Sequence, residues 1–261
     1  MIELGIKRKQ NGVPDLYKKD IEEIGSCIID DYCPDLLRTP QALDIDHFAE
    51  FYLGANLDYR YLSTDCRFLG MCVFNDTDKV IIYDEDTRRA EYFSVCARTI
   101  IIDKAVVIDP RQEHRYRFSL GHECGHLIKD SEYYCYNPNQ LELFGHADSP
   151  MITCKQSSIE GVFKGDPKYW DDRTRMEWQA DTFSAVLLMN KESIRELMKQ
   201  LGTSSNSVML NYDRVVNISK IYNVSLKAAE IRLRNLGYID VEDRTDYSSS
   251  IGRFKCMFNI A

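Results

Sequence analysis

Two histidines four residues apart, His122 and His126, enclose Glu123 in an H-E-x-x-H pattern. On an α-helix, side chains four positions apart leave the same face, so both imidazoles can bind one metal ion. Glu123 can act on a water molecule without occupying a coordination position. Two histidine ligands, an open position and a carboxylate general base are the arrangement of zinc hydrolases. With 5 His in the chain, the pattern arises by chance at a rate of about one per cent, so its surroundings must decide.

The residues around the motif favour a buried helix. Asp109-Pro110 is a helix-breaking pair upstream, and apolar anchors lie on both sides of the motif, at Phe118, Leu120, Leu127 and Ile128. Cys124 lies about 200° around the helix from His122 and is expected in the core rather than at the metal. Gly125 is costly inside a helix, and close packing at a metal site is one reason to accept that cost.

A catalytic zinc ion usually has a third protein ligand. A metzincin-like continuation would need Gly and His where the chain has Lys129 and Glu132, so that class is excluded. Glu177 is the better candidate, because residues 175–189 show helical apolar spacing and Asp181 shares its helix face. One carboxylate can bind zinc while the other accepts the free N–H of a ligand imidazole. Alone, this pair would be read as a solvated acidic helix face; beside an H-E-x-x-H helix, the metal reading is preferred.

Three segments resemble the ImmA/IrrE-type metallopeptidases, a gluzincin-like family. Residues 118–128 are similar to its F-x-L-x-H-E-x-G-H-L segment, and residues 177–189 to its E-x-x-A-x-x-F-A-x-x-L-L-M-P segment. Residues 224–237 resemble the short helical ending common in that family. The likeness extends from about residue 40 to 240, and its most specific part is the second segment in its correct order.

The resemblance implies a zincin-like fold, with His122, His126 and Glu177 as ligands of one Zn²⁺ ion, Asp181 beside them and Glu123 as catalytic base. Mn²⁺ or Fe²⁺ would suit the same ligands. It also implies a zinc endopeptidase whose partner and substrate is a helix-turn-helix transcriptional repressor, cleaved to derepress mobile-element or stress genes. Two departures are Asn190, where the family usually has Pro, and the long separation of the two metal-binding segments, which predicts an insertion over residues 130–172.

The remaining patterns predict an α+β fold with a small mixed or antiparallel sheet on the metal-binding helix and an α-helical C-terminal part. Apolar spacing predicts helices over 15–32, 40–54, 173–201 and 207–236. Runs of β-branched and aromatic residues predict strands at 59–62, 70–74, 80–83 and 99–103. We expect strand 99–103 to be an exposed edge that a substrate strand could join.

Four parts are predicted along the chain: an N-terminal helical segment, 1–39; a zincin-like core, 40–200, with the irregular insertion 130–172; a helix-turn-helix-like segment, 201–240; and a tail, 241–261. The net charge of −8 argues against direct nucleic-acid binding, although residues 215–237 resemble half a helix-turn-helix. An acidic enzyme could instead attract a basic DNA-binding protein. Nine scattered cysteines, no apolar signal core and no membrane-length apolar stretch predict a soluble, cytoplasmic protein without membrane partners.

Other readings stay open. Cys135, His146 and Cys154 could hold a second, structural metal, but their spacing matches no standard zinc module. His47 and His114 are expected to be surface or satisfied core residues. The main functional alternative is a non-catalytic, metal-containing regulatory protein that binds and sequesters a repressor. A third is a DNA-binding regulator acting through 207–237, against which the net charge argues.

Overall fold

The computed structural model describes residues 2, 4–134, 151–155, 166–201 and 208–239, with only the backbone described for 151–155 and 208–210. The strands are β1 (Asn56–Arg60), β2 (Phe68–Val73), β3 (Thr77–Asp84), β4 (Arg89–Val95), β5 (Thr99–Asp103) and β6 (Met151–Lys155). The helices are α1 (Lys18–Tyr32), α2 (Asp35–Arg38), α3 (Ile45–His47), α4 (Lys104–Ile108), α5 (Glu113–Lys129), α6 (Ser131–Tyr134), α8 (Asp172–Leu188), α9 (Lys191–Leu201), α10 (Val208–Tyr222) and α11 (Leu226–Asn235). Short π and 3-10 turns cover Phe48–Tyr52, Pro110–Gln112 and Pro167–Tyr169. The fold is α+β and zincin-like, as predicted.

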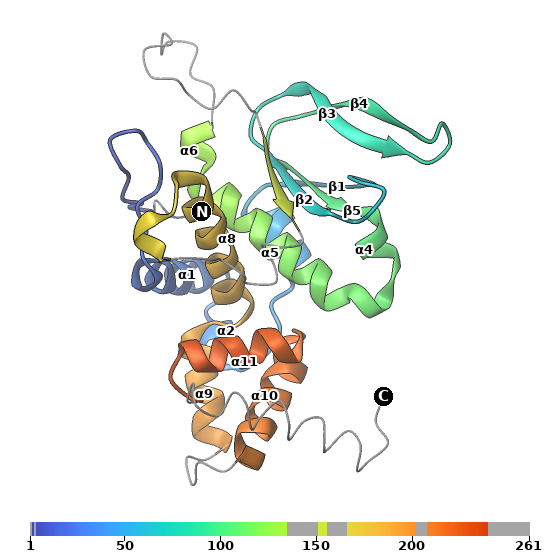
Figure 1. The fold of residues 1–261 in the computed structure, drawn as a ribbon. Coiled ribbons are helices and arrows are strands. Elements are labelled where there is room, and N and C mark those ends of the chain that lie inside the picture. The colour runs from blue at the N-terminus through green and yellow to red at the C-terminus, as the bar shows by residue number, and fades with distance from the viewer. Residues whose placement is uncertain (1, 3, 135–150, 156–165, 202–207, 240–261) are drawn as a thin grey trace.

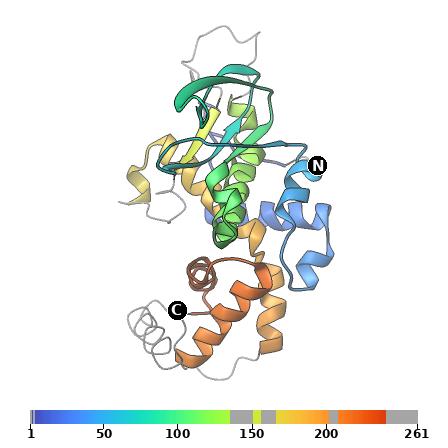
Figure 2. The same ribbon diagram turned by 90° about the vertical axis from the view of Figure 1, so that its right-hand side faces the viewer.

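The sheet lies above α5, and α9, α10 and α11 form a helical part below it (Figures 1 and 2). Its strand order is β1-β5-β2-β6, with β1 parallel to β5 and the other neighbours antiparallel. The expectation that strand 99–103 is an edge is therefore wrong. Every residue of β5 is buried. A central strand is covered on both faces, so a continuous apolar run indicates such a strand rather than an edge.

Successive side chains of a strand point to opposite faces, and this alternation divides the core. Cys72, Ile100 and Ile102 pack in the main core with α5, whereas Met71 and Ile101 pack under the separate β3–β4 hairpin. The same alternation turns Gly70 of β2 toward α5, where it meets Glu123. The register of β2 thus places Gly70, rather than a residue with a side chain, against Glu123 of the H-E-x-x-H motif.

The two metal-motif helices, α5 and α8, pack against each other closely. At Gly125, an added Cβ would lie 2.9 Å from the Phe183 Cβ and 3.1 Å from the Ala180 carbonyl oxygen. No real Cβ could be placed there without moving α8. Close packing is therefore the reason for glycine inside this helix, as the sequence suggested, and Cys124 lies fully buried in the core.

Two buried arginines join the helical part to the rest of the fold. Arg117 of α5 donates to the backbone oxygens of Asn223 and Leu43. Arg232 of α11 donates to the Met189 oxygen and forms an ion pair with Glu22 of α1. These contacts tie α11 and the turn before it to the helices that carry the metal motifs.

The predicted helix 173–201 is interrupted by Asn190, whose side-chain oxygen accepts from the Glu192 N–H at 2.9 Å at the start of α9. The predicted helix 207–236 is likewise two helices, joined by a turn where Asn223 has φ 51° and Ser225 caps α11. Within 130–172, the structure places α6 and the sheet strand β6, neither of which the sequence predicted.

Several predictions concern residues outside the described part of the chain. These are the tail 241–261, the residues Cys135 and His146, and the side chain of Cys154. The predicted four-part division of the chain stays a prediction. Among the described helices, none combines the length and apolar character that crossing a membrane requires.

Candidate metal centre

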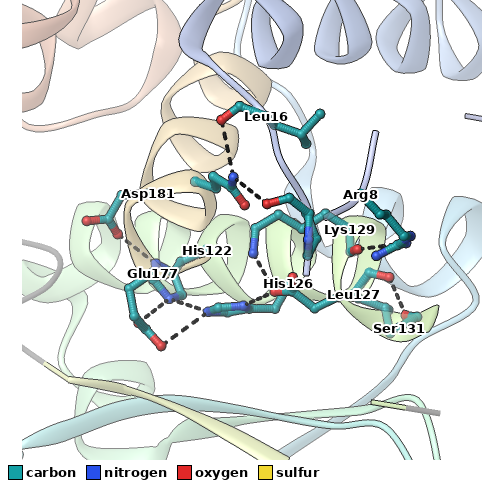
Figure 3. A network of polar contacts seen from close by, with 12 residues as sticks. Arg8, Leu16, His122, His126, Leu127, Lys129, Ser131, Glu177 and Asp181 are labelled. Atoms are coloured by element: carbon teal, nitrogen blue, oxygen red, sulfur yellow. Dashed lines mark hydrogen bonds and ion pairs between the residues drawn. The ribbon is translucent and has the colours of Figure 1, made fainter. Parts of the chain in front are cut away.

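Packing of α5 on α8 brings His122, His126 and Glu177 together (Figure 3). The Nε2 atoms of the two histidines are 3.0 Å apart. The Glu177 carboxylate lies 3.4 Å from Nε2 of His122 and 3.8 Å from Nε2 of His126. Both imidazoles are fully buried, and the Glu177 side chain is 12% exposed. The three side chains thus offer one ligand atom each, all within 4.8 Å of one another.

The opposite nitrogen of each imidazole is held by a carboxylate. Nδ1 of His122 lies 2.6 Å from Oδ1 of Asp181, and Nδ1 of His126 lies 2.6 Å from Oδ2 of Asp130. An ionised carboxylate only accepts hydrogen bonds, so each ring donates its Nδ1–H. Each Nε2 therefore presents a lone pair, which is the tautomer that a metal ion needs.

These residues fit a zinc ion. Nitrogen and oxygen ligands lie about 2.0–2.2 Å from tetrahedral zinc and hence about 3.4 Å from one another. The two Nε2 atoms are 3.0 Å apart, Oε2 of Glu177 lies 3.4 Å from His122 and Oε1 lies 3.8 Å from His126, all close to that spacing.

Glu123 lies on the sheet side of α5, beneath β2. Its side chain is fully buried, and neither oxygen has a hydrogen-bond partner among the described residues. Burial raises the pKa of Glu123 to about 7, although the imidazoles of His122 and His126 lower it. An added Cβ at Gly70 would lie 2.6 Å from Oε1 of Glu123. Glycine in β2 therefore leaves the space that this carboxylate occupies.

Asp130 and Lys129 are functional candidates that the sequence analysis missed. Both side chains are completely buried and form an ion pair, while Asp130 also holds His126. Burial lowers the pKa of Lys129, which its attraction to Asp130 opposes. The available signal was the spacing, because Asp130 follows His126 by four residues and so shares its helix face.

The N-terminal segment, residues 7–16, closes over this pair (Figure 3). Arg8 donates to the Lys129 backbone oxygen at 3.1 Å and to the Glu132 side chain at 2.8 Å. Gln179 of α8 donates to the backbone oxygens of Pro14 and Leu16. One segment therefore contacts both helices of the candidate centre.

The other two described histidines lie elsewhere, as expected. His47 contacts the Tyr32 hydroxyl at 2.8 Å and stacks on Phe51. His114 is exposed on the first turn of α5, 3.0 Å from Oδ1 of Asn223.

Replacing Asp130 by Asn is expected to weaken zinc binding by about 10- to 100-fold, because it removes the charged acceptor that orients His126. Isothermal titration with zinc would measure this. Asp130→Asn alone leaves the Lys129 cation buried without its partner, which destabilises the fold. Adding Lys129→Met removes that cation, so the double variant should regain stability but not zinc affinity. Glu132→Gln, at an exposed site nearby, is the matched control. Unchanged zinc affinity in Asp130→Asn would show that Asp130 has no positioning role.

Comparison with known protein families found a match to part of the chain. Residues 163–234 match a peptidase family model described as the IrrE N-terminal-like domain. The match covers α8, with Glu177 and Asp181, and most of the helical part, whereas the H-E-x-x-H helix precedes it. No curated protein matched. The match supports the resemblance to the ImmA/IrrE-type family and suggests a metallopeptidase.

Proposed function

We propose that this protein is a zinc-dependent endopeptidase that cleaves a helix-turn-helix transcriptional repressor and thereby derepresses mobile-element or stress genes. His122, His126 and Glu177 are the proposed zinc ligands, Glu123 the general base, and Asp181 the acceptor that orients His122.

One observation carries the metal assignment. Two imidazole nitrogens that both present lone pairs lie 3.0 Å apart in a buried site, with the ionised Glu177 carboxylate beside them. Lone pairs and negative charge at such distances repel one another, and burial strengthens the repulsion. A divalent cation between the three atoms removes it, which is why we favour a metal over a purely structural polar cluster.

The proposed chemistry requires proton transfer by Glu123. A zinc ion, when bound, polarises a carbonyl group and lowers the pKa of a coordinated water. With a pKa of about 7, the Glu123 carboxylate can accept a proton from the attacking water near neutral pH and return it to the leaving amine. Its buried position keeps bulk water from competing for that proton.

A peptide segment has a place to bind beside this carboxylate. Among the described strands, β6 pairs only with β2, and we propose that an extended chain adds to its other edge. β6 also contacts α5, which carries the proposed base. An added strand would gain backbone hydrogen bonds next to the catalytic residues. β6 therefore replaces strand 99–103 as the proposed substrate edge.

The repressor is proposed as substrate on two grounds. The three segments that resemble the ImmA/IrrE type imply this substrate class, and the chain carries a net charge of −8. A DNA-binding protein has a basic surface, so opposite charge favours encounter between the two.

The test combines the purified full chain with a helix-turn-helix repressor from the same genome, with zinc or with a chelator. We expect discrete repressor fragments in mass spectra with zinc and none with the chelator. A stable complex without fragments would instead favour the sequestering protein. Absence of both cleavage and binding would contradict the proposed substrate.

A further inference from the structure

A large cavity lies between the metal-motif helices and α11. It has a volume of about 890 Å³ and is lined by α8, the first half of α5, the start of α1 and one face of α11. This volume is within the range of cavities that hold small molecules, about 300–1,000 Å³, and exceeds the space a single substrate side chain needs. The buried contacts of Arg117 and Arg232 hold its walls together.

The cavity is separate from the proposed metal centre, but one residue, Asp181, borders both. His122, His126, Glu177 and Glu123 do not line it, whereas Asp181 does. Asp181 uses Oδ1 to hold His122, and its buried Oδ2 has no hydrogen-bond partner among the described residues. An occupant of the cavity therefore touches the residue that orients a proposed zinc ligand.

The walls combine an apolar surface with an excess of positive charge. Apolar surface comes from Phe118 of α5, Trp178 of α8 and Met189, which directly follows α8. Asp109 neutralises Arg111, and Glu22 neutralises Arg232.

Three further cations line the cavity: Lys18, Arg115 and Lys227. Among the described residues, Lys18 and Arg115 donate to uncharged oxygens, those of the Asn235 backbone and the Gln112 side chain. Lys227 is paired at 3.3 Å with Glu230, which also pairs with Arg234. Asp181 adds one negative charge to the lining, so five cationic side chains stand against two lining carboxylates, and this excess favours an anionic occupant.

We propose that this cavity binds a small anionic ligand with an aromatic or apolar body, and that the ligand regulates the metal centre by packing against Asp181. Its anionic group faces Lys18, Arg115 and Lys227, and its body lies against Trp178 and Phe118. A mononucleotide has both features. The binding site does not depend on the proposed peptidase activity.

The helices explain how occupancy would reach the metal. On α8, the lining residues Trp178 and Thr182 directly follow Glu177 and Asp181 in the chain, and on α5, Phe118 lies one turn before His122. A ligand that orders these walls also orders the proposed zinc ligands. Because coupling between two binding sites is reciprocal, zinc must then change the affinity of the ligand by the same factor as the ligand changes that of zinc.

A matched pair of probes tests the site. 1-Anilinonaphthalene-8-sulfonate has a sulfonate, fused rings and an N–H group, and N-phenyl-1-naphthylamine is the same molecule without the sulfonate. Fluorescence titration of the full chain should show the sulfonate probe binding at least tenfold more tightly. Excess AMP should displace it, whereas adenosine should compete at least tenfold less well. Equal affinity for both probes would overturn an anion site.

Two cavity variants and one control test where the sulfonate probe binds. Arg115→Glu with Lys227→Glu should weaken sulfonate binding at least tenfold, while Lys79→Glu with Arg89→Glu, the same charge change on the β3–β4 hairpin, should leave it unchanged. Ala185→Phe fills the cavity without altering charge and should also abolish binding. Circular dichroism checks that each variant folds. Sulfonate binding that survives both cavity variants would overturn the assignment.

The coupling has its own measurement. Zinc titrations with and without saturating sulfonate probe should give different zinc affinities, and probe titrations with and without zinc should differ by the same factor. Identical zinc affinities would reject regulation through Asp181. Because these readouts are binding constants, they stand even if no repressor is cleaved.

Discussion

Replacing Glu123 by Gln is expected to lower the peptide cleavage rate by about 10²- to 10⁴-fold and to leave zinc binding intact. Gln has nearly the same shape but cannot accept a proton, and Glu123 is not among the three grouped ligand atoms. The measurement pairs the initial rate of repressor cleavage with metal analysis of the same sample. Undiminished cleavage by the variant would refute the assigned base.

A second variant displaces the Glu123 carboxylate by a substitution in strand β2 of the sheet. Gly70→Ala adds a Cβ where Oε1 of Glu123 would be only 2.6 Å away, so the carboxylate must move. Cleavage should fall although Glu123 is still present, and zinc content should not change. Gly54→Ala is an unsuitable control, because the φ of Gly54 is 64°. Gly5→Ala is preferable, since nothing lies within 4 Å of its added Cβ.

Replacing Glu177 by Ala is expected to remove most bound zinc, because two histidines alone leave the site short of a protein ligand. His126→Ala should have the same effect. Metal analysis after dialysis measures the stoichiometry, and Glu196→Ala, at a half-buried acid on α9, serves as control. The ligand set would be rejected if either variant kept its zinc.

Zinc binding should also stabilise the native protein. At a free zinc concentration 1,000 times the dissociation constant, binding to the folded state alone contributes about 4 kcal/mol. The wild-type chain should therefore unfold at higher denaturant concentration with zinc than with chelator. The Glu177→Ala variant should show the same midpoint in both conditions.

The spacing of residues within each helix predicted most of the candidate site. His122 and His126 share a face of α5, and Glu177 and Asp181 share a face of α8, because residues four apart on any helix do so. The α+β class and the strands β2, β3 and β5 followed from equally local patterns of apolar residues. The strand β4 was missed because most of its side chains are exposed, so it lacks the apolar run that marked the others.

Only the tertiary structure decided how these local pieces meet. The sequence showed a helix with two histidines and a helix with two carboxylates, but not the 3.0–3.8 Å separations between their ligand atoms. It also did not place Gly70 over Glu123, set β5 in the centre of the sheet, or open a cavity behind Asp181. Helix periodicity depends on neighbours within one turn, whereas these features depend on packing between segments far apart in the chain, which no local pattern encodes.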